Sequence, residues 1–94
     1  MFLIIVDYKK PLEEVERYLA AHREFLDRYF AEGKLLCTGP QHPRTGGVIN
    51  SRASNRADVE TFTHEDPFYR HGIAVYTIVE FEPTKYVPGL EKFF

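Results

Sequence analysis

Uninterrupted and alternating apolar positions predict a strand at each end of the chain's main body. Residues 2–8, FLIIVDY, begin with five consecutive apolar side chains that are β-branched or aromatic for the most part, as is typical of a buried strand. Residues 73–83, IAVYTIVEFEP, form a longer strand whose two faces both stay apolar as far as Glu80. A strand with two apolar faces is expected to lie centrally in a sheet or to be covered on both sides.

A helical pattern follows the first of these two strands. Between residues 12 and 29, apolar side chains recur every three or four positions, which predicts a long amphipathic helix over roughly residues 11–32. Pro11 suits the first turn of such a helix, and Gly33 stands where a C-terminal cap glycine is expected.

The remaining segments complete a recognisable order of elements. Residues 34–39 and 46–53 predict two strands joined by a glycine-containing hairpin loop. Ser54 and Asn55 can cap a second helix that ends near Glu65. The order β-α-β-β-α-β is that of the ferredoxin-like α+β fold, with a four-stranded antiparallel sheet and two helices on one face. The 94 residues are expected to form a single domain, residues 1–94.

Charge and composition limit which partners and which cellular location we expect for the protein. The formal net charge of −2 argues against a nucleic-acid binder and against a polybasic membrane-surface protein. The first apolar run spans only five residues, too few for a signal peptide or a membrane span. Cys37 is the only cysteine, which excludes an intrachain disulfide and fits a cytoplasmic location. Its strand context predicts a small buried side chain rather than a nucleophile.

The aromatic content predicts a second copy of the chain as a partner. Aromatic residues make up 15% of the sequence, and the tail KYVPGLEKFF at residues 85–94 is too apolar for a free end. Two helices cover one sheet face only, so the other face still needs burial. We therefore expect a homodimer that packs sheet on sheet, with the tail closing the seam.

His22 is the most informative polar residue because it lies within the apolar stripe of the long helix, between Leu19 and Leu26. One interpretation is a core histidine satisfied by a hydrogen bond, or a stripe that turns outward at its edge. The other is a general acid or base at the rim of a pocket, since imidazole can both accept and donate a proton at physiological pH.

Asp66 also has two interpretations. Asp followed by Pro67 is typical of a capped helical turn, which Gly72 could close. Alternatively, its carboxylate orients an imidazole from the first helix and fixes the tautomer of the ring. One residue could do both. The neighbouring His64 and His71 match no common zinc spacing, so we expect no metal.

Several short motifs, taken in order, resemble the YciI-like family. They are His22 in HREFL, Gly39-Pro40 after the second strand, and Asp66 in EDPF. The resemblance covers nearly the whole chain. It implies a dimeric α+β barrel similar to muconolactone isomerases and to a dehydrochlorinase acting on chlorinated hydroxyhydroquinone, with His22 and Asp66 as a catalytic pair.

Two segments differ from the commoner form of that family. The loop after Pro40 contains His42 and Arg44, and the segment after EDPF adds Tyr69, Arg70 and His71. Arg70 either pairs with an anionic substrate or lies exposed on the surface.

These observations leave three functional hypotheses. The first is a cofactor-independent isomerase or lyase in which His22 moves a proton on a small cyclic or phenolic metabolite. In that hypothesis Asp66 holds the imidazole. The substrate contacts are expected from a set of residues near the strand ends and the second helix: Gly39, Pro40, Ser51, Phe68 and Arg70. The second hypothesis is a ligand-binding or regulatory module without turnover, and the third is an interaction subunit.

Overall fold

Four antiparallel strands and a layer of helices make up the computed structural model, which describes residues 1–94. The elements in chain order are β1 (Phe2–Tyr8), α1 (Leu12–Ala31), β2 (Leu35–Pro40), β3 (Gly46–Ser51), α2 (Arg56–Glu65), α3 (Pro67–Arg70), β4 (Ala74–Glu80) and the 3₁₀ helix η1 (Leu90–Phe93). The spatial order of the strands is β2-β3-β1-β4. This arrangement confirms the predicted ferredoxin-like α+β fold.

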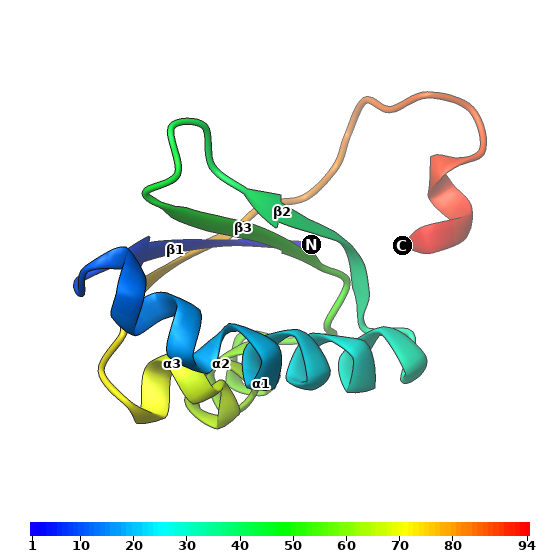
Figure 1. Cartoon of the computed structure of the whole chain (residues 1–94). Helices are drawn as coiled ribbons and strands as arrows, with labels where there is room; N and C mark the ends of the chain where they lie inside the picture. Colours follow the sequence, from blue (N-terminus) through cyan, green and yellow to red (C-terminus); the bar gives the residue numbers. More distant parts are fainter.

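The helices lie together on one face of the sheet (Figure 1). Figure 1 also shows that the chain after β4, coloured orange to red, leaves the sheet and ends in η1 apart from the helical layer. The opposite face of the sheet carries no helix. None of the helices combines the length and the hydropathy of a membrane-spanning segment.

Of the two alternatives for the strand near the C-terminus, a central position is wrong, and coverage on both sides stays a prediction. β4 pairs with β1 only and forms an edge of the sheet. Its side chains alternate between the two faces, so Ala74 is buried under the helical layer while Val75 and Val79 are exposed on the open face. The apolar character of β4 therefore reflects its two faces and not a central position.

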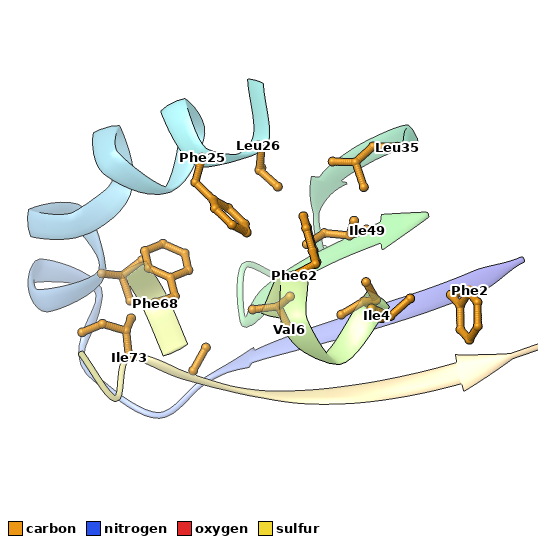
Figure 2. Close-up of a cluster of buried hydrophobic side chains, with 13 residues drawn as sticks. Phe2, Ile4, Val6, Phe25, Leu26, Leu35, Ile49, Phe62, Phe68 and Ile73 are labelled. Carbon is orange, nitrogen blue, oxygen red and sulfur yellow. The ribbon is translucent and has the colours of Figure 1, made fainter. Parts of the chain in front are cut away.

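The core fills the space between the sheet and the helices (Figure 2). β1 contributes every second residue, and helix α1 contributes Phe25 and Leu26. The buried apolar set is Phe2, Ile4, Val6, Val15, Phe25, Leu26, Leu35, Ile49, Val59, Phe62, Phe68, Ile73 and Ala74. At about 25 cal/mol per Å² of apolar surface, burial of this set is the main term that stabilises the fold.

Local capping sets where the helices begin and end. Gly33 has φ 74°, and the N–H groups of Gly33 and Lys34 donate to the carbonyls of Phe30 and Tyr29. This left-handed glycine ends α1 as predicted. The Asn55 side chain accepts from the N–H of Asp58 and caps α2, also as predicted.

Cys37 is exposed, and the expectation of a buried side chain is wrong. The pairing of β2 with β3 shifts register between Leu35 and Cys37. Leu35 is buried under the helices, whereas Cys37 lies opposite Asn50 on the open face of the edge strand. The bulge therefore turns the thiol away from the core.

Candidate functional site

His22 and Asp66 are in direct contact. The Nδ1 atom of His22 lies 2.9 Å from Oδ1 of Asp66, although the two residues are forty-four positions apart. His22 reaches the contact from the inward side of α1, and Asp66 occupies the single position between α2 and α3. Their side chains are 13% and 0% exposed. A carboxylate at Nδ1 favours the tautomer with the proton on Nδ1 and leaves Nε2 as the free base.

The Asp66 carboxylate accepts three hydrogen bonds. Oδ1 accepts from the His22 ring and from the N–H of Phe68 at 2.9 Å, and Oδ2 accepts from the Tyr76 hydroxyl at 2.6 Å. The bond from Phe68 caps α3, because Asp66 is the N-cap and Pro67 is the first helical residue. The same Asp66 carboxylate therefore caps α3 and accepts from the imidazole, so the two interpretations are compatible. It is completely buried, and its three hydrogen bonds compensate for the loss of hydration.

Phe68 supports the imidazole from its face. The rings of His22 and Phe68 stack with centroids 4.1 Å apart and an interplanar angle of 6°. Tyr8 meets the Phe68 ring edge-on at 5.9 Å. The Nε2 atom of His22 has no hydrogen-bond partner in the chain and is not a buried atom. The ring is thus fixed at one nitrogen and on one face, while its second nitrogen stays accessible.

A cavity of about 520 Å³ lies beside this ring. Its lining comes from β1, α1, the facing ends of β2 and β3 with their loop, and α3: Val6, Tyr8, Glu16, Leu19, His22, Arg23, Leu26, Thr38, Gly39, Pro40, Arg44, Gly46, Gly47, Val48, Ile49 and Phe68. The volume falls in the range of small-molecule sites, and the mixture of apolar walls with a few polar groups is also typical of them.

Glycines leave this space open. Gly39, Gly46 and Gly47 all line the cavity and place no side chain in it. Gly46 is required for a second reason, because a Cβ there would lie 1.7 Å from the carbonyl oxygen of Val6. β3 can therefore approach β1 this closely only without a side chain at Gly46.

Charged side chains line the part of the cavity nearest the hairpin loop. Arg44, from the loop between β2 and β3, donates to Glu16 of α1 across 2.7 Å. The hydrogen bond to Glu16, and then one to Tyr8, raises the pKa of Arg44 above its ordinary value. Arg23, the residue after His22, also lines the cavity and has no acidic partner within 4.0 Å.

Comparisons with known proteins place these features in a family. Residues 1–82 match the YCII-related domain. The chain belongs to this family. It is also 34% identical over 70 residues to the uncharacterized protein YjpA of Bacillus subtilis strain 168, covering 74% of this chain and 82% of YjpA.

The fold of this family member is similar to that of a solved enzyme. The structure of 5-chloro-2-hydroxyhydroquinone dehydrochlorinase, TftG, from Burkholderia phenoliruptrix AC1100 in complex with 2,5-dihydroxybenzoquinone matches with a TM-score of 0.73. The match covers 87% of this chain and 94% of TftG, at 22% identity. The likeness shows a shared ferredoxin-like α+β fold.

The structure brings some of the expected site residues together and leaves others apart. Gly39, Pro40 and Phe68 line the cavity with His22. Ser51 lies outside it, because its hydroxyl donates to the Lys34 carbonyl and accepts from the N–H of Ala53. Arg70 also lies outside, exposed at the end of α3. Neither residue lines this cavity, and their expected contact with a substrate stays a prediction.

The two histidines near Asp66 lie against aromatic rings. His71 stacks on Tyr18 with centroids 4.2 Å apart, and His64 stacks on Tyr69 at 4.5 Å. No group of three or more His, Cys, Asp or Glu side chains is arranged to hold a metal ion. The crowded sequence around Asp66 therefore contributes one polar side chain to the site.

Sequence reasoning missed Tyr76, the third group on the carboxylate. Burial, and then the charge of Asp66, raises the pKa of Tyr76 well above its ordinary value, so this phenol remains a hydrogen-bond donor. Tyr76 shares a face of β4 with Ala74 and Ile78, towards the helices. The feature of the sequence that could have indicated Tyr76 is its inward position on the last strand. A buried carboxylate needs hydrogen-bond donors beyond one imidazole.

Proposed function

We propose that this protein is a cofactor-independent enzyme of the isomerase or lyase type. His22 serves as general base and acid for a small cyclic or phenolic compound bound in the cavity. The contact between His22 and the fully buried Asp66 carries the proposal, because it holds Nδ1 and leaves an accessible Nε2 beside the cavity. A positioned base of this kind is worth about 10²–10⁴ in rate.

The proposed step moves one proton and one electron pair. Nε2 accepts a proton from a carbon or a ring hydroxyl of the substrate, and the electron pair left behind forms a new double bond. In an isomerisation the imidazolium returns the proton at another atom. In an elimination the same electron pair expels a leaving group as an anion, and the imidazolium releases its proton to solvent. Asp66 stabilises the imidazolium through Nδ1 in either case.

Two further observations support a cyclic substrate. The apolar walls from Val6, Leu19, Leu26 and Ile49 favour a flat hydrophobic body. The fold also matches that of TftG, whose structure holds 2,5-dihydroxybenzoquinone. Hydroxylated benzoquinones and hydroquinones are therefore the first compounds to test with this chain.

The test separates binding from turnover. His22→Gln removes the base and keeps a polar side chain of related size. We expect turnover of a substrate found in a hydroxyquinone screen to fall by at least about 100-fold, with ligand affinity changed by less than about threefold. His64→Gln, at an exposed position two residues before Asp66 and outside the cavity lining, is the matched control and should retain activity. Equal loss of affinity and turnover in His22→Gln would contradict a catalytic role.

A ligand-binding module without turnover is the second candidate function. It is favoured by the structural duties of Asp66, which caps α3 and receives the Tyr76 hydroxyl whether or not a proton is transferred. In that case His22 is a fixed hydrogen-bonding group for a ligand. Saturable binding of a hydroxyquinone with no product after prolonged incubation would favour this candidate.

We further propose that a second copy of the chain covers the open face of the sheet. Val75, Val79 and Phe81 are exposed there, and the tail adds exposed Tyr86 and Phe94. On the same face the buried side-chain oxygen Oδ1 of Asn50 has no hydrogen-bond partner. Sedimentation at micromolar concentration should give twice the 11.0 kDa chain mass, and Val79→Lys should shift it to the monomer. A wild-type monomer at these concentrations contradicts the homodimer.

A further inference from the structure

The cavity beside His22 carries a charge opposite to that of the whole chain. Two arginines, Arg23 and Arg44, and one glutamate, Glu16, line it. With His22 neutral, these lining side chains sum to one net positive charge, while the chain has a formal net charge of −2. The Asp66 carboxylate lies behind the His22 ring, is fully buried and is not part of the lining. A positive site on a negative protein attracts an anion from solution.

The ion pair between Glu16 and Arg44 is weak enough to open. Its side chains are 51% and 39% exposed, and exposed pairs of this kind stabilise a protein by only about 0–1 kcal/mol. Arg44 lies on a loop, whereas Glu16 is held on α1. A ligand carboxylate that reaches the cavity can therefore replace Glu16 on the guanidinium at little cost.

Arg23 offers a second cation on the lining of the same cavity. It lies seven positions after Glu16 on α1, roughly 10 Å along the helix axis, and it follows His22 directly. No acidic side chain within 4.0 Å neutralises it. Apolar side chains share the lining with these cations, which suits a ring with an acidic substituent.

We propose that the ligand of this cavity is a small planar ring that carries an oxyanion, such as a carboxylate. Arg44 releases Glu16 to bind this oxyanion, Arg23 adds to the attraction, and Glu16 acts as the counter-ion of the empty site. This inference rests on the proposed function and names its substrate class. In this proposal the cations that select an anion are Arg44 and Arg23, and not Arg70 as the sequence suggested.

The first experiment compares two probes that differ in charge. Isothermal titration of the full chain with 2,5-dihydroxybenzoate and with the neutral 2,5-dihydroxybenzamide should show tighter binding of the acid by roughly tenfold. Raising the salt concentration from about 50 to 500 mM should remove most of that preference. Equal affinity for the two probes, or no binding of the acid at millimolar concentration, overturns the proposal.

The second experiment uses variants with opposite expected signs. Arg44→Gln and Arg23→Gln should each weaken binding of the acid roughly three- to tenfold and leave the amide unchanged. Glu16→Gln should tighten binding of the acid, because it removes the competing carboxylate. Arg17→Gln and Glu14→Gln are the matched controls, since they form a surface pair on the same helix outside the cavity.

The sign of the Glu16→Gln effect decides between an anion site and a structural latch. If Glu16→Gln and Arg44→Gln weaken binding of both probes equally, the pair merely closes the loop onto α1 and the proposal is wrong. The readout is independent of catalysis, because His22→Gln should bind the acid with nearly wild-type affinity. If no screened compound is turned over, the preference for the acid over the amide can still be measured. If the two probes bind equally, turnover of a neutral substrate can still be measured.

Discussion

The backbone N–H of Phe68 and the ring of His22 donate to the same oxygen, Oδ1 of Asp66, while the Phe68 ring stacks on the imidazole. Phe68 therefore fixes His22 in two ways, through the shared acceptor and through the face of the ring. The imidazole retains little rotational freedom before any ligand arrives. Such preorganisation is what a proton-transfer site requires.

Phe68→Leu should loosen the imidazole while keeping the cap. The backbone N–H of residue 68 still reaches Asp66, but the flat support is lost. We expect the free energy of unfolding to fall by about 1–2 kcal/mol, measured by urea denaturation. Nitrogen NMR of the His22 ring should show exchange between tautomers. Phe30→Leu, an exposed position on α1, should change neither quantity by much.

Asp66→Ala should be more damaging than Asp66→Asn. Alanine leaves three donors without an acceptor, namely the His22 ring, the Phe68 N–H and the Tyr76 hydroxyl. We expect a loss of about 3–5 kcal/mol for alanine, and of about 1–2 kcal/mol for asparagine, which still caps α3. Asp58→Asn is the exposed control and should lie within about 0.5 kcal/mol of the wild type. Equal losses for both Asp66 variants would contradict a role for the cap.

Stability should fall at alkaline pH because of Tyr76. Burial and the Asp66 charge raise the pKa of Tyr76 in the folded chain, whereas an unfolded tyrosine ionises near about pH 10. Above that pH the unfolded chain binds fewer protons than the folded one, so the free energy of unfolding decreases as pH rises. Below that pH the contribution is fully present.

Tyr76→Phe tests this assignment. At neutral pH the variant should lose about 1–3 kcal/mol, because Asp66 loses a donor. From about pH 10 upward its stability should fall less steeply than that of the wild type, so the gap narrows. Burial, and then Glu65, raises the pKa of Tyr29 to about 12. Tyr29 therefore contributes part of the fall in stability with rising pH in both proteins. Parallel pH curves for Tyr76→Phe and the wild type would contradict the prediction.

Gly46→Ala should distort the sheet, whereas Gly39→Ala should not. A Cβ at Gly46 meets the Val6 carbonyl oxygen at 1.7 Å, while nothing lies within 4 Å of a Cβ at Gly39. We expect Gly46→Ala to lose roughly 2–3 kcal/mol or more by overpacking, and Gly39→Ala to stay close to the wild type. Thermal unfolding measures both. Two equally stable variants would show that β3 can move away from β1 freely.

Local patterns predicted the architecture well because each element has its own signal. The long helix, its Gly33 terminus and the Asn55 cap follow from periodicity and cap chemistry alone. His22 was also visible, because a polar residue within an apolar stripe requires a reason. Asp66 needed the order of elements in addition, since it meets His22 only after the second helix returns to the first.

The rest of the site depends on contacts that no local pattern encodes. Arg44 and Glu16 are twenty-eight residues apart, and nothing in either segment predicts their pairing. Ser51 is buried as an inward strand residue, but its hydroxyl donates a hydrogen bond to the nearby Lys34 carbonyl. The edge position of β4 likewise follows from strand order and not from its composition.

The Asp66 carboxylate has a consequence for the folding of the chain. It joins a histidine from the first helix to the N–H that caps α3 and to a phenol, both from residues 66–76. Fraying of α3 would remove the Phe68 N–H from Oδ1 and the Phe68 ring from the face of the imidazole, and would leave Asp66 with the His22 and Tyr76 hydrogen bonds. A partly folded chain therefore has no poised base, so the site becomes competent only when both halves of the fold are docked. The state of the His22 ring would then report the docking of α1 against residues 66–76.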